Sequence, residues 1–273
     1  MFLIGFGNDN LQYQSLLHAN ELDNNLGLVL SLAQSDGDGT LPNGDHKFQR
    51  LNVHMQHSNQ DTQSDLIVGY QDKFYGWPGA YTGFASLAET DHTKTKLLLA
   101  NHRQNLINGY WEVGGFYRRL DDDYDFNRTT QETGTPGSFD HITRVYGIGL
   151  QGQYAVDSIE WDYAGQIISD ELVYSTDLTE GEFNSRNYGS LSLIPAINIR
   201  GSDYPDIRLR LGGNIDWSNE DGSTFSPVFS ISMNNIGISG SSFLTLEYAS
   251  SSQLPGYTAL KSPPTGLFGG NAD

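Results

Sequence analysis

The sequence predicts an all-β fold: a transmembrane, antiparallel, up-and-down β-barrel, present as a partial barrel of about thirteen strands. Three observations predict it. Apolar and polar residues alternate along most of the chain; in residues 144–156, for example, Tyr146, Ile148 and Leu150 alternate with glycine and glutamine, and successive strand side chains point to opposite faces. Most of the predicted strands have about 9–13 residues, longer than the usual strand of about 5–6. Short turns alternate with mostly long loops, which is the rhythm of a membrane barrel.

Each strand is predicted where this alternation begins and ends, and turn-forming residues separate one strand from the next. The first alternates Phe2, Ile4 and Phe6 with smaller residues before Asn8-Asp9-Asn10 turns the chain. The short turns fall near residues 21–25, 58–62, 104–109, 157, 201–205 and 235–239. No segment has a convincing helical period. The expected strands are 1–6, 11–20, 26–33, 46–57, 66–71, 93–103, 110–120, 144–156, 159–167, 190–199, 207–217, 225–234 and 244–249.

Composition excludes several classes of function. The net charge of −18 argues against nucleic-acid binding, which needs a basic surface. The absence of cysteine excludes disulfides, thiolate metal sites and cysteine catalysis. Apolar residues make up only 37%, which is low for a packed core, whereas 31 glycines and 15 tyrosines suit long strands with one polar face. No apolar run approaches the ~20 residues of a transmembrane helix.

Two other architectures fit the alternation itself. A soluble all-β carbohydrate-binding domain or glycan-active enzyme would bury the apolar faces against a second sheet and would stay soluble without detergent. A passive outer-membrane porin, complete in one chain, would have an even number of strands and a terminal aromatic strand. The rhythm of the connections favours the membrane barrel over the soluble domain, and neither feature of the porin is seen.

Four segments resemble the barrel of a TonB-dependent outer-membrane receptor. Residues 35–46, with Ser-Asp-Gly and Pro-Asn-Gly-Asp-His, resemble the start of an early extracellular loop. Residues 70–82 and 117–128 resemble strand-to-loop junctions. Residues 254–273, from Leu-Pro-Gly-Tyr-Thr to Gly-Gly-Asn-Ala-Asp, are similar to a late-barrel segment of that family. The order of short and long connections is closest to the vitamin B12 (cobalamin) receptor branch.

This resemblance implies a bacterial outer-membrane location, contact with outer-membrane lipid and a transport function rather than an enzymatic one. The complete protein is expected to take up a scarce nutrient, either a metal chelate such as a siderophore or cobalamin, and to couple to the TonB complex through a plug domain. Receptors of this kind have 22 strands and a plugged lumen. Residues 1–273 contain neither a plug nor the last strands, so we expect them to be a partial barrel, truncated at both ends.

Loop aspartates suggest a calcium site. Asp36, Asp38 and nearby Asp45 lie on a Gly-rich segment, and carboxylate oxygens are the hard ligands that calcium takes. Some cobalamin receptors resemble this chain in using loop aspartates for calcium. The segment lacks the other positions of an EF-hand loop, and a solvated loop is the competing interpretation.

Two further groups suggest contact with a nutrient ligand. Tyr75, Trp77 and Tyr81 are expected on the third extracellular loop, where their rings could stack on a ligand or anchor the loop. An acidic run could attract a cationic complex or simply be solvated; it contains Asp121, Asp122, Asp123 and Asp125.

Other residues are assigned to the barrel wall. Trp111, Trp161 and Trp217 are expected in the aromatic girdle of the membrane interface. Arg208 and Arg210 are expected to line the lumen, where they would touch a plug or pair across strands. No catalytic motif is present: there is no Gly-x-Ser-x-Gly elbow, no phosphate-binding glycine loop and no His-Glu-x-x-His.

Overall fold

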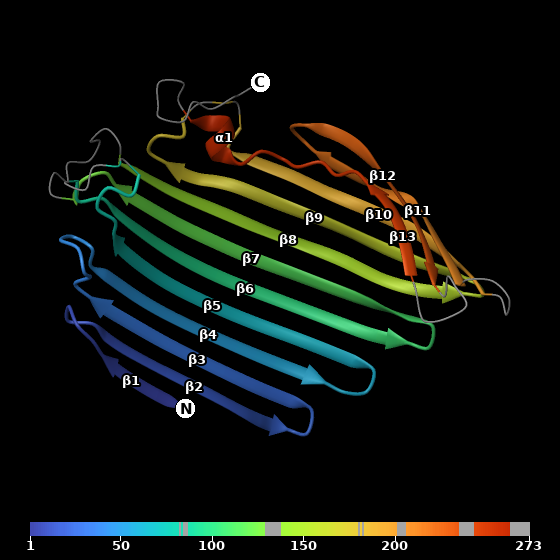
Figure 1. Ribbon diagram of the computed structural model, residues 1–273, viewed down its shortest axis with the longest axis horizontal. Coiled ribbons are helices and arrows are strands. Elements are labelled where there is room, and N and C mark those ends of the chain that lie inside the picture. The colour runs from blue at the N-terminus through green and yellow to red at the C-terminus, as the bar shows by residue number, and fades with distance from the viewer. Residues whose placement is uncertain are drawn as a thin grey trace.

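The computed structural model describes residues 1–81, 83, 87–128, 138–179, 181, 183–200, 206–234 and 243–262. In these residues the strands form one 13-stranded antiparallel sheet whose spatial order follows the sequence, so that each strand pairs with its sequence neighbours (Figure 1). The elements are β1 (Phe2–Phe6), β2 (Gln12–Asp23), β3 (Leu26–Gly37), β4 (His46–Ser58), β5 (Thr62–Gly76), β6 (Thr90–Leu106), β7 (Gly109–Asp125), β8 (Phe139–Val156), β9 (Ile159–Ser175), β10 (Ser185–Ile199), β11 (Asp206–Ser218), β12 (Gly222–Asn234), β13 (Phe243–Ala249) and α1 (Tyr257–Lys261).

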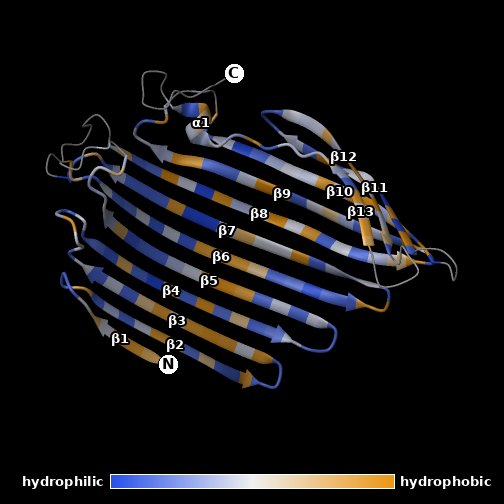
Figure 2. Cartoon of the chain, in the orientation of Figure 1, coloured by the Kyte–Doolittle hydropathy of each residue, from blue (hydrophilic) through white to orange (hydrophobic). Residues whose placement is uncertain are grey.

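The register between strands collects the apolar residues on one side of the sheet, which we call the apolar face. Ile148 on β8 lies opposite Ile167 on β9, and Leu191 on β10 lies opposite Ile215 on β11. The residues that alternate with these along each strand, such as Gln151, point to the opposite side of the sheet, which we call the polar face. The alternation of hydrophobic and hydrophilic positions is visible along the strands in Figure 2.

The apolar face is exposed rather than packed. Ile148 is 59% exposed, Ile167 58% and Leu211 68%. The buried hydrophobic side chains of the described residues are only Ala88, Tyr124, Leu172, Leu178, Ala196 and Val228, and no second sheet covers the apolar face there. A soluble sandwich would bury this face. The predicted fold class, a partial membrane barrel of thirteen strands, is therefore confirmed.

The apolar face has the length that a membrane requires. On β8 it runs from Tyr146 to Val156, which covers the about 9–11 residues that a tilted strand needs to cross a bilayer. In the described part of the chain, no helix has the length and apolarity needed to cross a membrane.

Several strands extend beyond their predicted ends on the side of the long loops. β7 continues to Asp125, so the acidic run predicted as a loop is part of a strand, and β9 continues to Ser175. Asp36 likewise lies within β3. Backbone pairing between β6, β7 and β8 carries the sheet past the apolar region, as far as Asp125 on β7.

One helix was not predicted. Residues 250–256 run from β13 to α1, and this segment and the helix lie against the polar face near β9 and β10 (Figure 1). Five residues are too few for a helical period to be read from sequence. Tertiary contacts, described below, hold the helix in place.

Candidate functional site at the loop end of the polar face

The strands β3, β5, β7 and β9 end, and β4, β6, β8 and β10 begin, at one edge of the sheet, which we call the loop end (Figure 1). Two clusters of side chains lie on the polar face near this end. Both lie beyond the apolar region of the opposite face, whose last row toward the loop end on β6–β8 contains Leu98, Tyr117 and Tyr146.

The first cluster is a continuous row of aromatic rings, which we call the aromatic ladder: His46, Tyr75, Trp77, Tyr81, Tyr124, Phe139 and His141. Successive ring centroids lie 6.4, 6.2, 5.9, 5.0, 4.9 and 4.7 Å apart. These separations are in the range of favourable aromatic contacts, up to about 7 Å. The ladder crosses from β4 and β5, through the segment after β5, to β7 and β8.

Glu89 fixes the middle of the ladder. Trp77 N–H donates to the Glu89 backbone oxygen (2.7 Å), and Tyr81 N–H donates to Glu89 Oε2 (2.9 Å). The Glu89 side chain is fully buried, and burial together with this carboxylate raises the pKa of the Tyr124 phenol. Tyr81 itself remains 59% exposed. The backbone at Trp77 and Tyr81 is therefore held by Glu89, while Tyr81 stays exposed.

Two carboxyl groups beside the ladder are partly desolvated: Asp91, between Tyr75 and Tyr124 in the same row, and Asp122, two residues before Tyr124 on β7. Burial raises the pKa of both Asp91 and Asp122, and the Asp91 charge raises that of Asp122 further. The charged forms of both groups are thus disfavoured, and a nearby positive charge would relieve the penalty.

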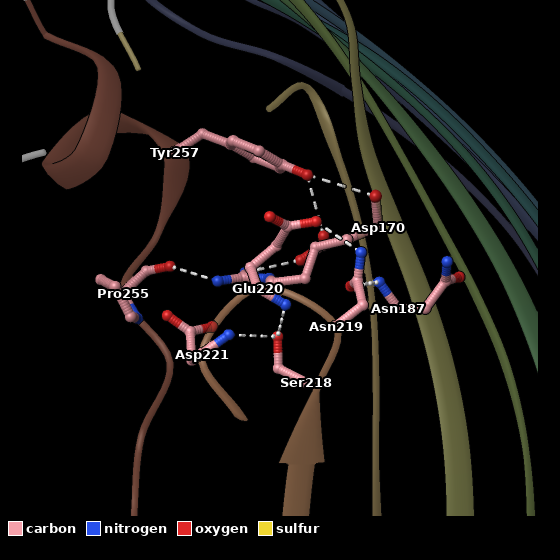
Figure 3. A network of polar contacts seen from close by, with 9 residues as sticks. Asp170, Asn187, Ser218, Asn219, Glu220, Asp221, Pro255 and Tyr257 are labelled. Atoms are coloured by element: carbon pink, nitrogen blue, oxygen red, sulfur yellow. Dashed lines mark hydrogen bonds and ion pairs between the residues drawn. The ribbon is translucent and has the colours of Figure 1, made fainter. Parts of the chain in front are cut away.

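The second cluster is centred on a buried guanidinium, and we call it the Arg186 cluster (Figure 3). The Arg186 side chain is 5% exposed; its Nη2 donates to Asp170 Oδ2 (2.7 Å) and its Nη1 to the Pro255 carbonyl (3.0 Å). Tyr257 Oη donates to Asp170 Oδ1 (2.9 Å). Since Asp170 and Arg186 are directly opposed on β9 and β10, the cluster fastens residues 255–257 to the wall.

Further contacts hold the rest of this segment. Lys261 Nζ donates to the Phe183 carbonyl (3.1 Å), and Ser252 Oγ donates to Asp216 Oδ2 (3.2 Å). A groove of about 480 Å³, lined partly by Arg186, Asp216 and Pro255, lies between the segment and strands β9–β12. Beside it, the β11–β12 turn is closed by Ser218 Oγ, which accepts from the backbone N–H groups of Glu220 and Asp221 (Figure 3).

The structure separates the three aspartates predicted to contact ligand. Asp122 lies on the polar face with the ladder, whereas Asp121 and Asp123 point to the other face. There Asp121 Oδ1 accepts from Arg119 Nε (2.7 Å). By contrast, Tyr75, Trp77 and Tyr81 are brought together, as consecutive rings of the ladder.

The three aspartates proposed for calcium are not assembled. Asp36 points to the apolar side of β3, Asp38 Oδ2 accepts from Asn10 Nδ2 (2.5 Å), and Asp45 Oδ1 is paired with Arg128 Nη1 (2.7 Å). Among the described residues, no group of three or more His, Asp or Glu side chains could hold a metal ion. Strand pairing and local partners keep these three carboxylates apart, so the predicted calcium site is not preassembled in the described residues and stays a prediction.

The predicted girdle tryptophans all lie on the apolar face but at two levels. Trp111 and Trp161 lie near the short turns, and Trp217 lies near the loop end of β11.

The predicted lumen arginines pair across strands. Arg208 is paired with Glu160, and Arg210 Nη2 donates to Asp162 Oδ2 (3.2 Å).

Sequence reasoning missed Glu89, Tyr124 and Phe139 of the ladder, as well as Asp170, Arg186 and Tyr257. Tyr124 and Phe139 lie between the expected strands 110–120 and 144–156, in residues predicted as a loop. Asp170 and Arg186 oppose each other only in a register that depends on a loop of unpredictable geometry. The sequence offers one signal for the longer strand: a period of two continues past Leu120 into the polar residues.

No protein-family model and no curated protein matches the chain. Solved structures match across most of it. The ferric preacinetobactin receptor BauA from Acinetobacter baumannii aligns with a TM-score of 0.55 at 10% identity, covering 83% of this chain and 43% of BauA. The unliganded ferric citrate transporter FecA aligns with a TM-score of 0.54 at 12% identity, covering 90% of this chain and 42% of FecA. The outer membrane transporter YddB from Escherichia coli aligns with a TM-score of 0.55 at 13% identity, covering 82% of this chain and 36% of YddB.

The chain thus spans less than half the length of each of these structures. At such low identity the match concerns the fold. The predicted cobalamin branch finds no support among these matches, and residues 263–273, part of the resemblance, lie outside the described residues. The chain has the fold of part of an outer-membrane receptor barrel, as its resemblance to TonB-dependent receptors predicted.

Proposed function

We propose that this chain forms part of the barrel wall of a TonB-dependent receptor in the bacterial outer membrane, and that the protein takes up a scarce nutrient. The observation that carries the proposal is the exposed apolar face opposite a polar face with paired charges, on strands long enough to cross a bilayer. The receptor and transporter functions of the structures with this fold support it. The plug and the remaining strands of the barrel would belong to the rest of the protein.

The loop end of the polar face is proposed as part of the ligand site. The ladder offers aromatic faces at Trp77 and Tyr81, and Asp122 places a partly desolvated carboxyl on the same face, where a cationic ligand would stabilise its charged form. Large, rigid and partly apolar ligands, such as ferric chelates or cobalamin, suit stacking on such rings.

Tryptophan fluorescence provides the test, because Trp77 is the only one of the four tryptophans on the ladder. The protein, in the length its host makes, is purified from outer membranes in detergent and titrated with ferric siderophores, ferric citrate and cobalamin. We expect one of these ligands to quench the emission saturably. Trp77→Phe should remove most of that quenching and weaken binding about tenfold, while Trp111→Phe, on the apolar face, should leave affinity unchanged.

Two results would contradict the proposal. Recovery of the protein in the soluble fraction without detergent would show that its apolar face is not in a membrane. Unselective passage of small solutes through reconstituted vesicles, with no saturable ligand, would favour a passive porin instead.

A further inference from the structure

The structure places three positive charges side by side on the apolar face. Lys96 on β6 lies opposite Arg119 on β7, and Arg119 lies opposite Arg144 on β8. We call these three residues the cation row. The row is flanked by Tyr70 and Glu171, which lie opposite Lys96 and Arg144.

The cation row lies at the margin of the apolar region. Two residues along each strand toward the short turns, the same face carries Leu98, Tyr117 and Tyr146, of which Leu98 is 44% and Tyr146 49% exposed. Tyrosines favour the membrane–water interface, so this margin corresponds to the headgroup level on the loop side.

Such a row is unfavourable without an anion. Directly opposed side chains on neighbouring strands have Cβ atoms about 4.5–5.5 Å apart, and like charges there destabilise the sheet. General basicity does not explain the row, because the chain has only 15 Lys and Arg against 33 Asp and Glu.

Protein carboxylates neutralise the row only in part. Arg119 Nε donates to Asp121 Oδ1 (2.7 Å) and Arg144 Nε to Glu171 Oε2 (3.1 Å), whereas Lys96 is exposed and has no hydrogen bond or ion pair among the described residues. A guanidinium carries five N–H donors, so both arginines retain donors for a further anion.

We propose that the cation row binds the phosphate of a membrane lipid headgroup, with the acyl chains lying along Leu98 and the two tyrosines. The proposal rests on the membrane placement proposed above. Phosphate oxygens accept charge-assisted hydrogen bonds from arginine and lysine, and the adjoining exposed apolar row suits a lipid better than a free anion.

Native mass spectrometry of the detergent-purified protein tests this. The probes are dioleoyl phosphatidic acid, dioleoylglycerol, which lacks the phosphate, and inorganic phosphate. We expect Lys96→Gln/Arg119→Gln to weaken phosphatidic acid binding about tenfold or more. The matched control Arg50→Gln/Arg118→Gln removes two exposed cations of the polar face and should change the affinity less than about twofold. Retained strand circular dichroism establishes that the variants fold.

The outcomes separate the two proposals. Equal phosphatidic acid affinity in both double variants, or equal affinity for dioleoylglycerol, would overturn the lipid site while leaving the membrane placement intact. Binding of inorganic phosphate as tight as that of phosphatidic acid would also overturn it, in favour of a free anion. A protein that needs no detergent would overturn the membrane placement itself.

Discussion

At the scale of single residues, Arg186 is a charged side chain buried against its partner. The side chain is 5% exposed, and its Nη2 is paired with Asp170 Oδ2 at 2.7 Å. Removing one partner of a buried ion pair leaves an uncompensated charge, which costs about 3–5 kcal/mol. We therefore expect Arg186→Gln to lower the free energy of unfolding in detergent by about that amount, measured by urea titration.

Arg118→Gln is the control for this change. Arg118 is exposed on the polar face and makes no hydrogen bond or ion pair among the described residues. Its loss should alter stability by less than about 0.5 kcal/mol. Equal effects of the two substitutions would mean that Arg186 does not hold residues 255–257 to the wall.

Some of the residues predicted as a site from their closeness in sequence lie together in the structure, and others do not. Tyr75, Trp77 and Tyr81 were proposed together and do lie ring to ring, because the chain turns tightly after β5. Asp121 to Asp123 were also proposed together, but strand alternation sends Asp122 to one face and its neighbours to the other. Whether a polar segment continues a strand depends on pairing with β6 and β8, which local sequence does not reveal.

At the scale of elements, a glycine determines how β10 and β11 pack. Gly189 lies opposite Trp217, and a Cβ at Gly189 would lie 2.5 Å from Trp217 Cζ2 and 2.4 Å from the Gln166 backbone oxygen. Neither separation is tolerable, so Gly189→Ala must displace the indole or the neighbouring strand. We expect a loss of about 1–3 kcal/mol in unfolding free energy, with a change in Trp217 fluorescence.

The control for Gly189→Ala is Gly149→Ala, in the middle of β8. There the nearest atoms to a new Cβ are 3.5 Å away, an ordinary contact. Because alanine restricts the unfolded chain, this variant should be neutral or more stable by up to about 1 kcal/mol. A destabilisation as large as that of Gly189→Ala would show that loss of glycine, rather than the contact with Trp217, matters.

All thirteen strands were predictable, because each carries a period of two over most of its length. Their loop-side ends were not. The apolar half of the alternation stops where the membrane region ends, yet backbone pairing continues, for example from Leu120 to Asp125 on β7. The five-residue helix α1 escaped prediction because long-range contacts with Asp170 and Phe183 hold it.

At the scale of the whole molecule, the two faces should respond differently to the same charge. Leu150 is 46% exposed on the apolar face, and Gln151 follows it on the polar face. Arginine on a lipid-facing position near the bilayer midplane destabilises a barrel by about 2–4 kcal/mol. We expect Leu150→Arg to reduce the folded fraction in lipid vesicles and Gln151→Arg to leave it nearly unchanged, both followed by urea unfolding. A reversed order would assign the polar face to the lipid.

The neighbour-only pairing of the sheet also bears on how such a wall is assembled. In the described residues every strand pairs with the strands before and after it in sequence, and the β4–β5, β6–β7 and β8–β9 hairpins close through very short turns. Contacts between sequence neighbours carry a small loop-closure entropy, and no segment has to be threaded past another. The sheet can therefore grow one hairpin at a time, with the free edge of the newest strand as the template for the next.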